Sequence, residues 1–422
     1  MLEIGTASIR ARFGCAVSGH SSRGSDSQMV ARGPRAEPLA LHVNRAGLVG
    51  GVERLVLTLS DHALGGGYRA LLACPGGGPL EAAARARSIP VAPVGIDLRV
   101  PANPATLLAL PAQWLRAEAA LRRLCEERGV DVIHAHHPVG ALHAGGVART
   151  LGLPLVLHLH EIAPERRLHL LALRKAARIA DRVVCGSEAS RRLLRATVEV
   201  DPAKVDVVYN AVDSRFARRA ERAPADLGEA GPHIGVFGLL APRQGQNVFL
   251  NAAARLVEDH PDAKFWIVGP AAIDADAWFA EHLWDLSETP ALAGRVRFPG
   301  FRPDIPEMMK AMDVVVLPAT RMESIPMTLA EALTLGCRVI ASDLGGAAEA
   351  ILSGQTGLLT PPGDPVALAA AIDRMLGPEG PRLARAARQH ARLRFRPETF
   401  SRRVAEVYAR AGARGPAREA AA

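Results

Sequence analysis

The chain of 422 residues is long enough for two α/β domains of ordinary size, and its apolar content of 49%, with a mean hydropathy of +0.09, can fill two cores. No run approaches the ~18 consecutive apolar residues that a membrane span needs. The net charge of +8 comes almost wholly from arginine, and aromatic residues make up only 4%, so a nucleic-acid surface with stacking platforms is not expected. The five cysteines are scattered without a C-x-x-C pair, which predicts reduced thiols and a cytoplasmic location.

Residues 1–36 carry polar residues and scattered arginines without the apolar segment of a signal peptide, so we expect a disordered leader outside the fold. After it, short β-branched apolar runs alternate with helical patterns. The predicted strands are 39–43, 70–73, 91–94, 132–136, 155–160, 183–186 and 205–208, and a long helix is predicted at 104–128. Such alternation predicts a parallel sheet with helices on both faces in a first domain, 37–215, with ligands at the carboxyl ends of the strands.

A second domain, 233–396, follows a linker at 216–232 that is rich in Arg, Ala, Glu and Pro and has no strand periodicity. Its predicted strands are 234–238, 265–269, 296–298, 314–317 and 339–342. The last helix is predicted at 397–413, with Phe400, Val404, Val407 and Tyr408 on one face. The sequence therefore predicts an α/β fold with two doubly wound domains, one after the other along the chain.

The stretch 317–346 is the most informative part of the chain. A buried strand leads into a loop that holds Glu323, and the loop leads into a helix that holds Glu331. Between these carboxylates, the backbone amides of Met327 and Thr328 are expected at the helix N-terminus, which is a ready site for an anion. Carboxylates beside it suit sugar hydroxyls, because hydroxyls donate hydrogen bonds. The layout predicts a nucleotide-sugar pocket.

The spacing of these residues matches a family signature. Glu323 and Glu331 are separated by seven residues, and the sequence from Glu331 to Gly346 follows the pattern E-A-x-x-x-G-x-x-V-I-A-S-D-x-G-G. This stretch closely resembles the signature of retaining GT-B glycosyltransferases of family 4. An ordinary amphipathic helix with exposed glutamates is the alternative, but the match covers roughly thirty positions and not two.

The resemblance implies a GT-B fold, in which two Rossmann-like domains face each other across a cleft and the last helix, 397–413, crosses back to the first domain. It also implies transfer from a nucleoside-diphosphate sugar, a UDP-sugar by preference, to a hydroxyl acceptor, with retention of configuration. The donor is a co-substrate, and neither a cofactor nor a metal is expected.

The resemblance also suggests roles for particular residues. Glu323 and His160 match catalytic positions. The expected donor-binding residues are Glu331, Arg243, Gly50, Gly51, Gly238, Phe301, Arg302, Ser324, Ile325, Pro326, Met327 and Thr328. Among them, the Gly50–Gly51 turn is expected to face the diphosphate, and Phe301 with Arg302 to lie beside the base. The expected acceptor-side residues are His136, His158 and Glu161.

One departure from the family pattern affects the diphosphate site. Family 4 enzymes usually carry G-R-L-x-x-x-K-G at the start of the second domain, where the Arg and Lys hold the donor diphosphate. Here Leu239 takes the Arg position, Gln244 takes the Lys position, and only Arg243, one residue earlier, keeps a positive charge. A charge-assisted hydrogen bond to phosphate contributes roughly 1.5–3 kcal/mol, so losing two without replacement would weaken the hold on the donor.

Two sequence patterns are of the kind found in metal sites, but we interpret neither of them as a metal site. Five histidines, His134, His136, His137, His158 and His160, fall near strand ends, but their spacing is poor for a ligand set and no carboxylate or cysteine completes one. Asp274 and Asp276 form a D-x-D in a polar stretch, which we interpret as surface. No metal site is predicted.

Alternatives remain open for function and partners. The intact Glu323, Glu331 and His160 favour an enzyme, whereas Leu239 and Gln244 favour a non-catalytic GT-B protein. A nucleotide-sugar epimerase of the same fold is less favoured. The acceptor is a small molecule or a glycan, and the oligomeric state is not indicated. The basic amphipathic segment 166–182 suits an anionic membrane surface, but an ordinary outer helix is favoured.

Overall fold

The computed structural model describes residues 37–45, 47, 49–62, 66–95, 110–219, 221–228, 230–271 and 278–413. These residues belong to one compact unit, 37–422. The predicted leader at 1–36, the start of the predicted helix 104–128 and the D-x-D at 274–276 lie outside the described residues.

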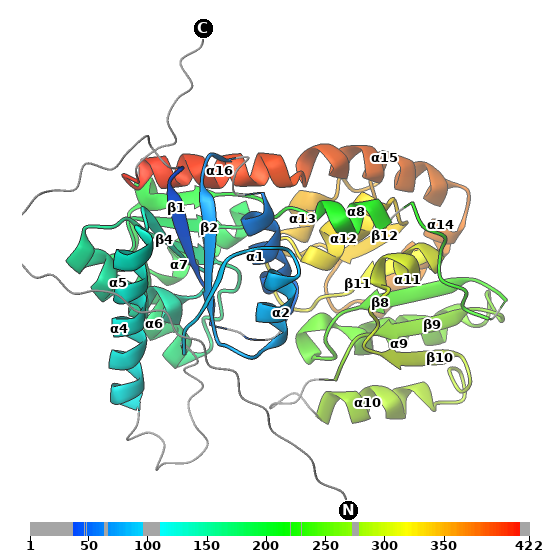
Figure 1. The fold of residues 1–422 in the computed structure, drawn as a ribbon. Coiled ribbons are helices and arrows are strands. Elements are labelled where there is room, and N and C mark those ends of the chain that lie inside the picture. The colour runs from blue at the N-terminus through cyan, green and yellow to red at the C-terminus, as the bar shows by residue number, and fades with distance from the viewer. Residues whose placement is uncertain are drawn as a thin grey trace, which may run out of the picture. The chain divides into compact units, whose positions relative to one another are not determined.

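The first half of the unit contains a seven-stranded parallel sheet of order β3-β2-β1-β4-β5-β6-β7 (Figure 1). The strands are β1 (Leu39–Val43), β2 (Arg69–Cys74), β3 (Val91–Pro93), β4 (Val132–Ala135), β5 (Leu155–Leu159), β6 (Arg182–Cys185) and β7 (Val205–Val207). The helices are α1 (Gly51–Asp61), α2 (Pro79–Arg85), α4 (Leu110–Arg128), α5 (Pro138–Leu151), α6 (Arg167–Ile179) and α7 (Glu188–Thr197). Each predicted strand is present; β1 matches its predicted range, and the ends of the others differ by at most one residue.

The second half contains a six-stranded parallel sheet of order β10-β9-β8-β11-β12-β13. Its strands are β8 (His233–Phe237), β9 (Lys264–Val268), β10 (Val296–Gly300), β11 (Val314–Leu317), β12 (Val339–Ser342) and β13 (Leu358–Thr360). Its helices are α9 (Gln246–Leu256), α10 (Trp278–Ser287), α11 (Ile305–Ala311), α12 (Met327–Leu335), α13 (Ala347–Ala350), α14 (Pro365–Leu376) and α15 (Glu379–Arg394). Two doubly wound sheets in sequence confirm the predicted fold class.

The apolar character of the central strand β11 follows from burial on both sides. Val315 packs in the cluster that includes α12 and α15, whereas Val314 and Val316 pack in the opposite cluster with α9 and α14. All three side chains are 0% exposed. A strand that faces two helical layers needs apolar residues at successive positions, and the sequence supplies them.

The last helix, α16 (Pro397–Arg410), packs on the first sheet as predicted (Figure 1). Its side chains Phe400, Val404 and Tyr408 form one buried cluster with Ala40 and other strand residues of the first sheet. The chain crosses between the two halves at two places, and these are joined, because the Val212 amide donates to the Phe395 carbonyl at 3.0 Å.

The predicted linker is more ordered than its composition suggests. It begins within the short helix α8 (Ser214–Arg219), which packs on α11 and α12. Phe216, Ala225 and Leu227 are partly buried against the second core. The linker therefore contributes to the second half of the molecule.

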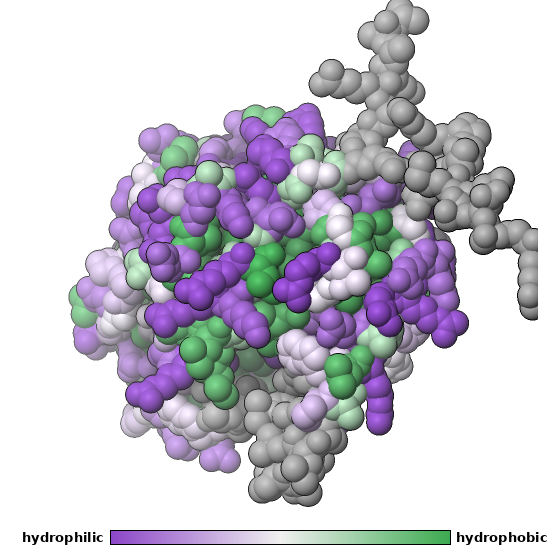
Figure 2. All heavy atoms as spheres, turned by 90° about the vertical axis from the view of Figure 1, so that its left-hand side faces the viewer, coloured by the Kyte–Doolittle hydropathy of each residue, from purple (hydrophilic) through white to green (hydrophobic). Residues whose placement is uncertain are grey.

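The helix predicted at 166–182 is α6, and its apolar side is less covered than expected. Leu173 and Ala177 are buried, but Leu168 and Leu171 are 71% and 59% exposed. Figure 2 looks onto the side of the molecule where α4, α5 and α6 lie, and apolar side chains gather there between hydrophilic ones. None of the described helices is both long enough and apolar enough to cross a bilayer.

Candidate active site

The loop between β11 and α12 is fixed by the backbone of two glycines. The Gly346 amide donates to the Glu323 carbonyl at 3.0 Å. A Cβ at Gly345 would lie 2.4 Å from that carbonyl oxygen, and a Cβ at Gly346 would lie 2.3 Å from the Ile325 amide nitrogen. Since neither position has room for a side chain, the paired glycines of the signature allow two backbones to meet directly. This contact sets the position of Glu323.

The N-terminus of α12 has the predicted form. Pro326 is the N-cap, and the first bond of the helical pattern runs from the Ala330 amide to the Pro326 carbonyl at 3.1 Å. The amides of Met327 and Thr328 come before this bond and have no partner within the helix, so they suit an anion. The side chain of Met327 is 9% exposed and packs in the same buried cluster as α16.

Contacts from the first sheet reach the same loop. The Asn210 side-chain amide donates to the Ile325 carbonyl at 3.0 Å, so this carbonyl is occupied. Ser324 is buried, and its Oγ has no partner among the described residues.

The Glu349 carboxylate accepts from the amides of Glu188 and Ala189, at 2.9 and 2.6 Å, at the N-terminus of α7. A carboxylate there is favoured by the helix dipole.

Glu331 lies inside the structure, on the second turn of α12. It is the fifth helical residue, because the helix begins at Met327. Its side chain is 3% exposed, and Arg54 Nη2 on α1 is 3.3 Å from Oε2. That contact lacks hydrogen-bond geometry, and Oε2 has no hydrogen-bond partner among the described residues.

The electrostatics of Glu331 follow from this burial. Desolvation raises the pKa of the carboxyl to about 7, with Arg54 lowering it and Asp213 raising it further. The carboxyl therefore lies close to its titration point at neutral pH, and its Oε2 accepts from none of the described residues. A group of this kind gains from a ligand that brings hydroxyl donors into the site.

Glu323 is the more exposed carboxylate, with 31% of its side chain accessible. Gln244 donates its side-chain amide to Oε1 at 2.8 Å, and Arg243 Nε lies 3.7 Å from the same oxygen. Burial of the carboxyl group raises its pKa, Arg243 opposes the rise, and Glu161 adds to it. The residue that replaces the family's lysine is thus a partner of Glu323.

The segment that departs from the family pattern is held close to the same loop. Gly245 has φ 73°, and a Cβ there would lie 1.8 Å from the Pro318 carbonyl oxygen. The Gly238 amide donates to the Val268 carbonyl at 2.9 Å, so this amide extends the sheet and does not point to a ligand. Gln246, which is fully buried, donates to the Leu239 carbonyl at 2.9 Å.

The glycine turn before α1 faces α12, but one of its amides is already occupied. A Cβ at Gly51 would lie 3.6 Å from the Met327 side chain, which places the turn beside the α12 N-terminus. The Gly50 amide donates to Glu53 Oε2 at 3.0 Å, and Asn44 donates to Oε1 at 3.3 Å. An anion at this turn therefore competes with the glutamate of its own helix for the Gly50 amide.

A layer of histidines covers the ends of three neighbouring strands, and two sets of three bring their ring nitrogens within 4.8 Å of one another. The absence of a metal site, expected from the poor spacing for a ligand set, stays a prediction. Sequence spacing does not show which strands are adjacent, whereas the sheet places β4 between β1 and β5. The layer consists of His42, His134, His136, His158 and His160. The sequence did not indicate His42 as a member of this group. His137, which the sequence did indicate, instead caps α5, because its ring accepts a hydrogen bond from the Val139 amide at 3.1 Å.

The histidine layer is joined by hydrogen bonds. His42 Nδ1 is 3.0 Å from His136 Nε2, and His136 Nδ1 is 3.3 Å from His160 Nε2. His134 Nδ1 is 2.7 Å from the Tyr408 hydroxyl. Burial lowers the pKa of His160 to about 4, so the imidazole is neutral at pH 7. A neutral His160 supplies no positive charge to a donor phosphate.

The remaining predicted site residues are peripheral. Phe301 is 74% exposed, as a side chain available to a ligand would be. The Arg302 guanidinium donates to both oxygens of Asp304, at 2.8 and 2.6 Å, so it is already paired. Glu161 is exposed beside His160.

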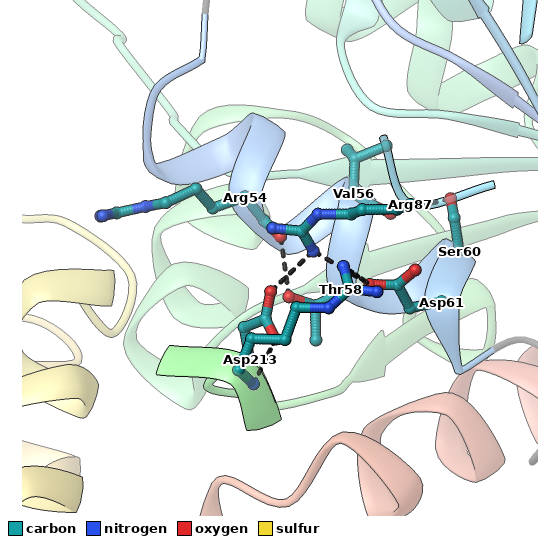
Figure 3. A network of polar contacts seen from close by, with 8 residues as sticks. Arg54, Val56, Thr58, Ser60, Asp61, Arg87 and Asp213 are labelled. Atoms are coloured by element: carbon teal, nitrogen blue, oxygen red, sulfur yellow. Dashed lines mark hydrogen bonds and ion pairs between the residues drawn. The ribbon is translucent and has the colours of Figure 1, made fainter. Parts of the chain in front are cut away.

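A network of ion pairs lies close to the point where the chain first passes from one half of the molecule to the other, and it was not predicted from the sequence (Figure 3). Arg87 Nη1 is 3.0 Å from Asp61 and 2.6 Å from Asp213, and Arg215 is 3.0 Å from the same oxygen of Asp61. Arg54 and Asp213, which act on the Glu331 pKa, come from α1 and from the segment after β7. Nothing in their local sequence marks them, because they meet Glu331 only in the fold.

Comparisons with known proteins agree with this geometry. The family model "Glycosyltransferase Family 4" matches residues 49–216, and "Glycosyl transferases group 1" matches residues 231–377. The D-inositol 3-phosphate glycosyltransferase of Salinispora tropica is 30% identical over 320 residues, which are 68% of this chain and 65% of the relative. That of Mycobacterium ulcerans is 29% identical over 311 residues, again 68% and 65%.

Solved structures show the same architecture. HepE from Anabaena, in complex with UDP-glucose, superposes with a TM-score of 0.74 at 26% identity, covering 88% of this chain and 99% of HepE. A glycosyltransferase from Rickettsia africae gives a TM-score of 0.74 at 19% identity, covering 89% and 99%. The two doubly wound halves and the returning α16 thus define the GT-B class. Within that class, the chain belongs to glycosyltransferase family 4.

Proposed function

We propose that the protein is a retaining glycosyltransferase that moves a sugar from a UDP-sugar to a hydroxyl of a small acceptor without a metal. The observation that carries the proposal is Glu331, a buried carboxyl whose Oε2 has no hydrogen-bond partner among the described residues, one turn from the first amides of α12 at Met327 and Thr328. HepE, at 26% identity, is in complex with UDP-glucose, which supports the choice of UDP.

The acceptor is proposed from the relatives. They are named D-inositol 3-phosphate glycosyltransferases, so a cyclic polyol phosphate is the first acceptor to try. The chain spans 65% of the length of these relatives, and their activity is carried over only as a proposal. Four buried cysteines without disulfides, Cys74, Cys125, Cys185 and Cys337, support a cytoplasmic location.

In the proposed reaction, Glu331 accepts hydrogen bonds from the ribose hydroxyls, and the α12 amides face the diphosphate. The bond from the anomeric carbon to the diphosphate oxygen breaks, and the acceptor oxygen forms the new bond to that carbon on the same face of the sugar. The leaving phosphate oxygen takes the proton of the acceptor hydroxyl. Glu323 faces the transferred sugar and stabilises the positive charge that develops on it. Neutral His160 exchanges hydrogen bonds with the sugar or its phosphate.

The diphosphate carries roughly two negative charges that must be offset as it leaves. Arg243 is the candidate, because its guanidinium is 3.7 Å from Glu323 and its stem is long enough to turn toward the phosphate. In the structure, Glu323 Oε1 accepts from Gln244 and lies 3.7 Å from Arg243 Nε. Donor binding must therefore draw Arg243 away from Glu323.

Arg243→Ala should cost at least tenfold in kcat/KM, about 1.4 kcal/mol. Leu239→Arg with Gln244→Lys, which restores the family pair, should recover part of the loss. Arg255→Ala, on the exposed side of α9, is the control. Turnover that does not respond to Arg243→Ala would contradict this mechanism and leave the fold untouched.

A non-catalytic GT-B protein is the second candidate. Two observations favour it, namely the neutral Gln244 at the lysine position and the Gly50 amide occupied by Glu53. On this account, nucleotides bind without turnover of any donor, and Arg243→Ala leaves their affinity unchanged. A screen of UDP-, GDP- and dTDP-sugars by thermal shift, followed by assay of released nucleotide, separates the two candidates.

A further inference from the structure

One member of the histidine layer, His158, has no role in the proposed reaction. His158 is 0% exposed, and neither ring nitrogen has a hydrogen-bond partner among the described residues. A buried polar atom without a hydrogen-bond partner is destabilising, so it calls for a ligand, an ion or a water. Two unpartnered nitrogens on one ring make His158 the most strongly marked member of the layer.

The neighbours of His158 complete a set of three. One ligand nitrogen from each of His136, His158 and His160 lies within 4.8 Å of the others. For tetrahedral Zn²⁺ with Zn–N bonds of about 2.0–2.1 Å, neighbouring nitrogens lie roughly 3.3–3.4 Å apart. The edge from His136 Nδ1 to His160 Nε2 is already 3.3 Å. The remaining two edges are within 4.8 Å.

The surroundings of the set fit a metal ligand shell. His136 uses Nδ1 toward the set, and its Nε2 is 3.0 Å from His42 Nδ1, which is the outer hydrogen bond that orients a ligating imidazole. His160 is half-buried at the strand end and leaves an open side. The other set of three, with His42 and His134, is entirely buried, and His134 Nδ1 already bonds to Tyr408.

We propose that His136, His158 and His160 bind a divalent first-row transition-metal ion of the Zn²⁺ class, and that the bound ion withholds His160 from the donor sugar. Three imidazoles without a carboxylate select Zn²⁺, Co²⁺, Ni²⁺ or Cu²⁺ over Mg²⁺ or Ca²⁺, which need oxygen ligands. The second clause rests on the proposed function. The ion then inhibits a transfer that needs no metal.

Co²⁺ is the probe, because its tetrahedral complexes absorb visible light strongly. The untagged full-length chain, stripped with EDTA and desalted, should bind one Co²⁺ with tetrahedral absorption, and one equivalent of Zn²⁺ should abolish the signal. His158→Phe and His160→Ala should each weaken binding at least tenfold. The matched control is His143→Phe, because His143 is equally buried, has two unpartnered ring nitrogens and lies outside the layer, against Trp114.

Circular dichroism shows whether each variant folds. If His158→Phe does not fold, His160→Ala still tests the site, because its side chain is only half-buried. A wild-type chain without tetrahedral absorption, or titrations unchanged in both ligand variants, would overturn the site. If Co²⁺ binds but Zn²⁺ leaves sugar transfer unaffected, the inhibitory clause is overturned. If no donor turns over, that clause fails with the proposed function, while the Co²⁺ titration still decides the site.

Discussion

Glu331→Gln gives the sharpest test of the buried carboxyl on α12. The substitution keeps the shape of the side chain and removes its titration. The pKa of Glu331 is raised from 4.5 to about 7, mainly by burial. Since one pKa unit corresponds to 1.36 kcal/mol, the difference between the folded and unfolded protein is worth about 3 kcal/mol.

The direction in which the free energy of unfolding changes with pH follows from proton binding. Between pH 4.5 and 7 the folded protein holds a proton on Glu331 that the unfolded chain has lost, so the free energy of unfolding falls as pH rises through this window. The wild type should therefore lose about 3 kcal/mol relative to Glu331→Gln between pH 4.5 and 7.5. Below pH 4.5 the carboxyl is protonated in both states, and the difference should be constant.

Urea unfolding of the unliganded protein at pH 4.5, 5.5, 6.5 and 7.5 measures this difference. Glu258→Gln removes a carboxyl from the exposed surface and serves as the control. Parallel pH curves for the wild type and Glu331→Gln would refute the reasoning. They would show that Arg54, 3.3 Å away, keeps Glu331 charged despite its burial.

Further predictions concern the same loop. Glu331→Ala should weaken UDP and UDP-sugar binding alike by roughly 1–3 kcal/mol in calorimetry, and unchanged affinity would remove Glu331 from the pocket. Glu323→Ala should lower turnover more than UDP affinity, so an equal loss of both would argue against its place at the transferred sugar. Gly346→Ala should destabilise the protein by at least about 1–3 kcal/mol, because its Cβ would lie 2.3 Å from the Ile325 amide, whereas Gly95→Ala, which meets nothing within 4 Å, should be nearly neutral. Activity should survive EDTA, and strict dependence on Mg²⁺ or Mn²⁺ would contradict the proposed reaction.

The strands were predictable because burial on both faces demands an apolar run. β11 and β12 match the predicted ranges at both ends. β13 was missed, since three residues carry too little pattern to separate a strand from a loop. α8 was read as part of a linker because Arg and Ala dominate it, although its partly buried Phe216 packs against the second core.

The local part of the site was predictable, and its distant contacts were not. The α12 N-terminus and the close approach of Gly345 and Gly346 follow from residues within one short stretch. The pairing of Glu331 with Arg54 depends on how two separate elements pack. The histidine layer depends on strand order, which places His42 opposite His134 although the two are far apart in sequence.

We propose above all that the protein transfers sugar from a UDP-sugar with retention. The most direct measurement is proton NMR of the product formed from UDP-glucose and an inositol phosphate, in the presence of EDTA. The account predicts release of UDP together with a new glycoside that keeps the α-configuration of the donor, and loss of both signals in Glu323→Ala. An inverted product, or no turnover of any nucleotide sugar that the protein binds, would contradict it.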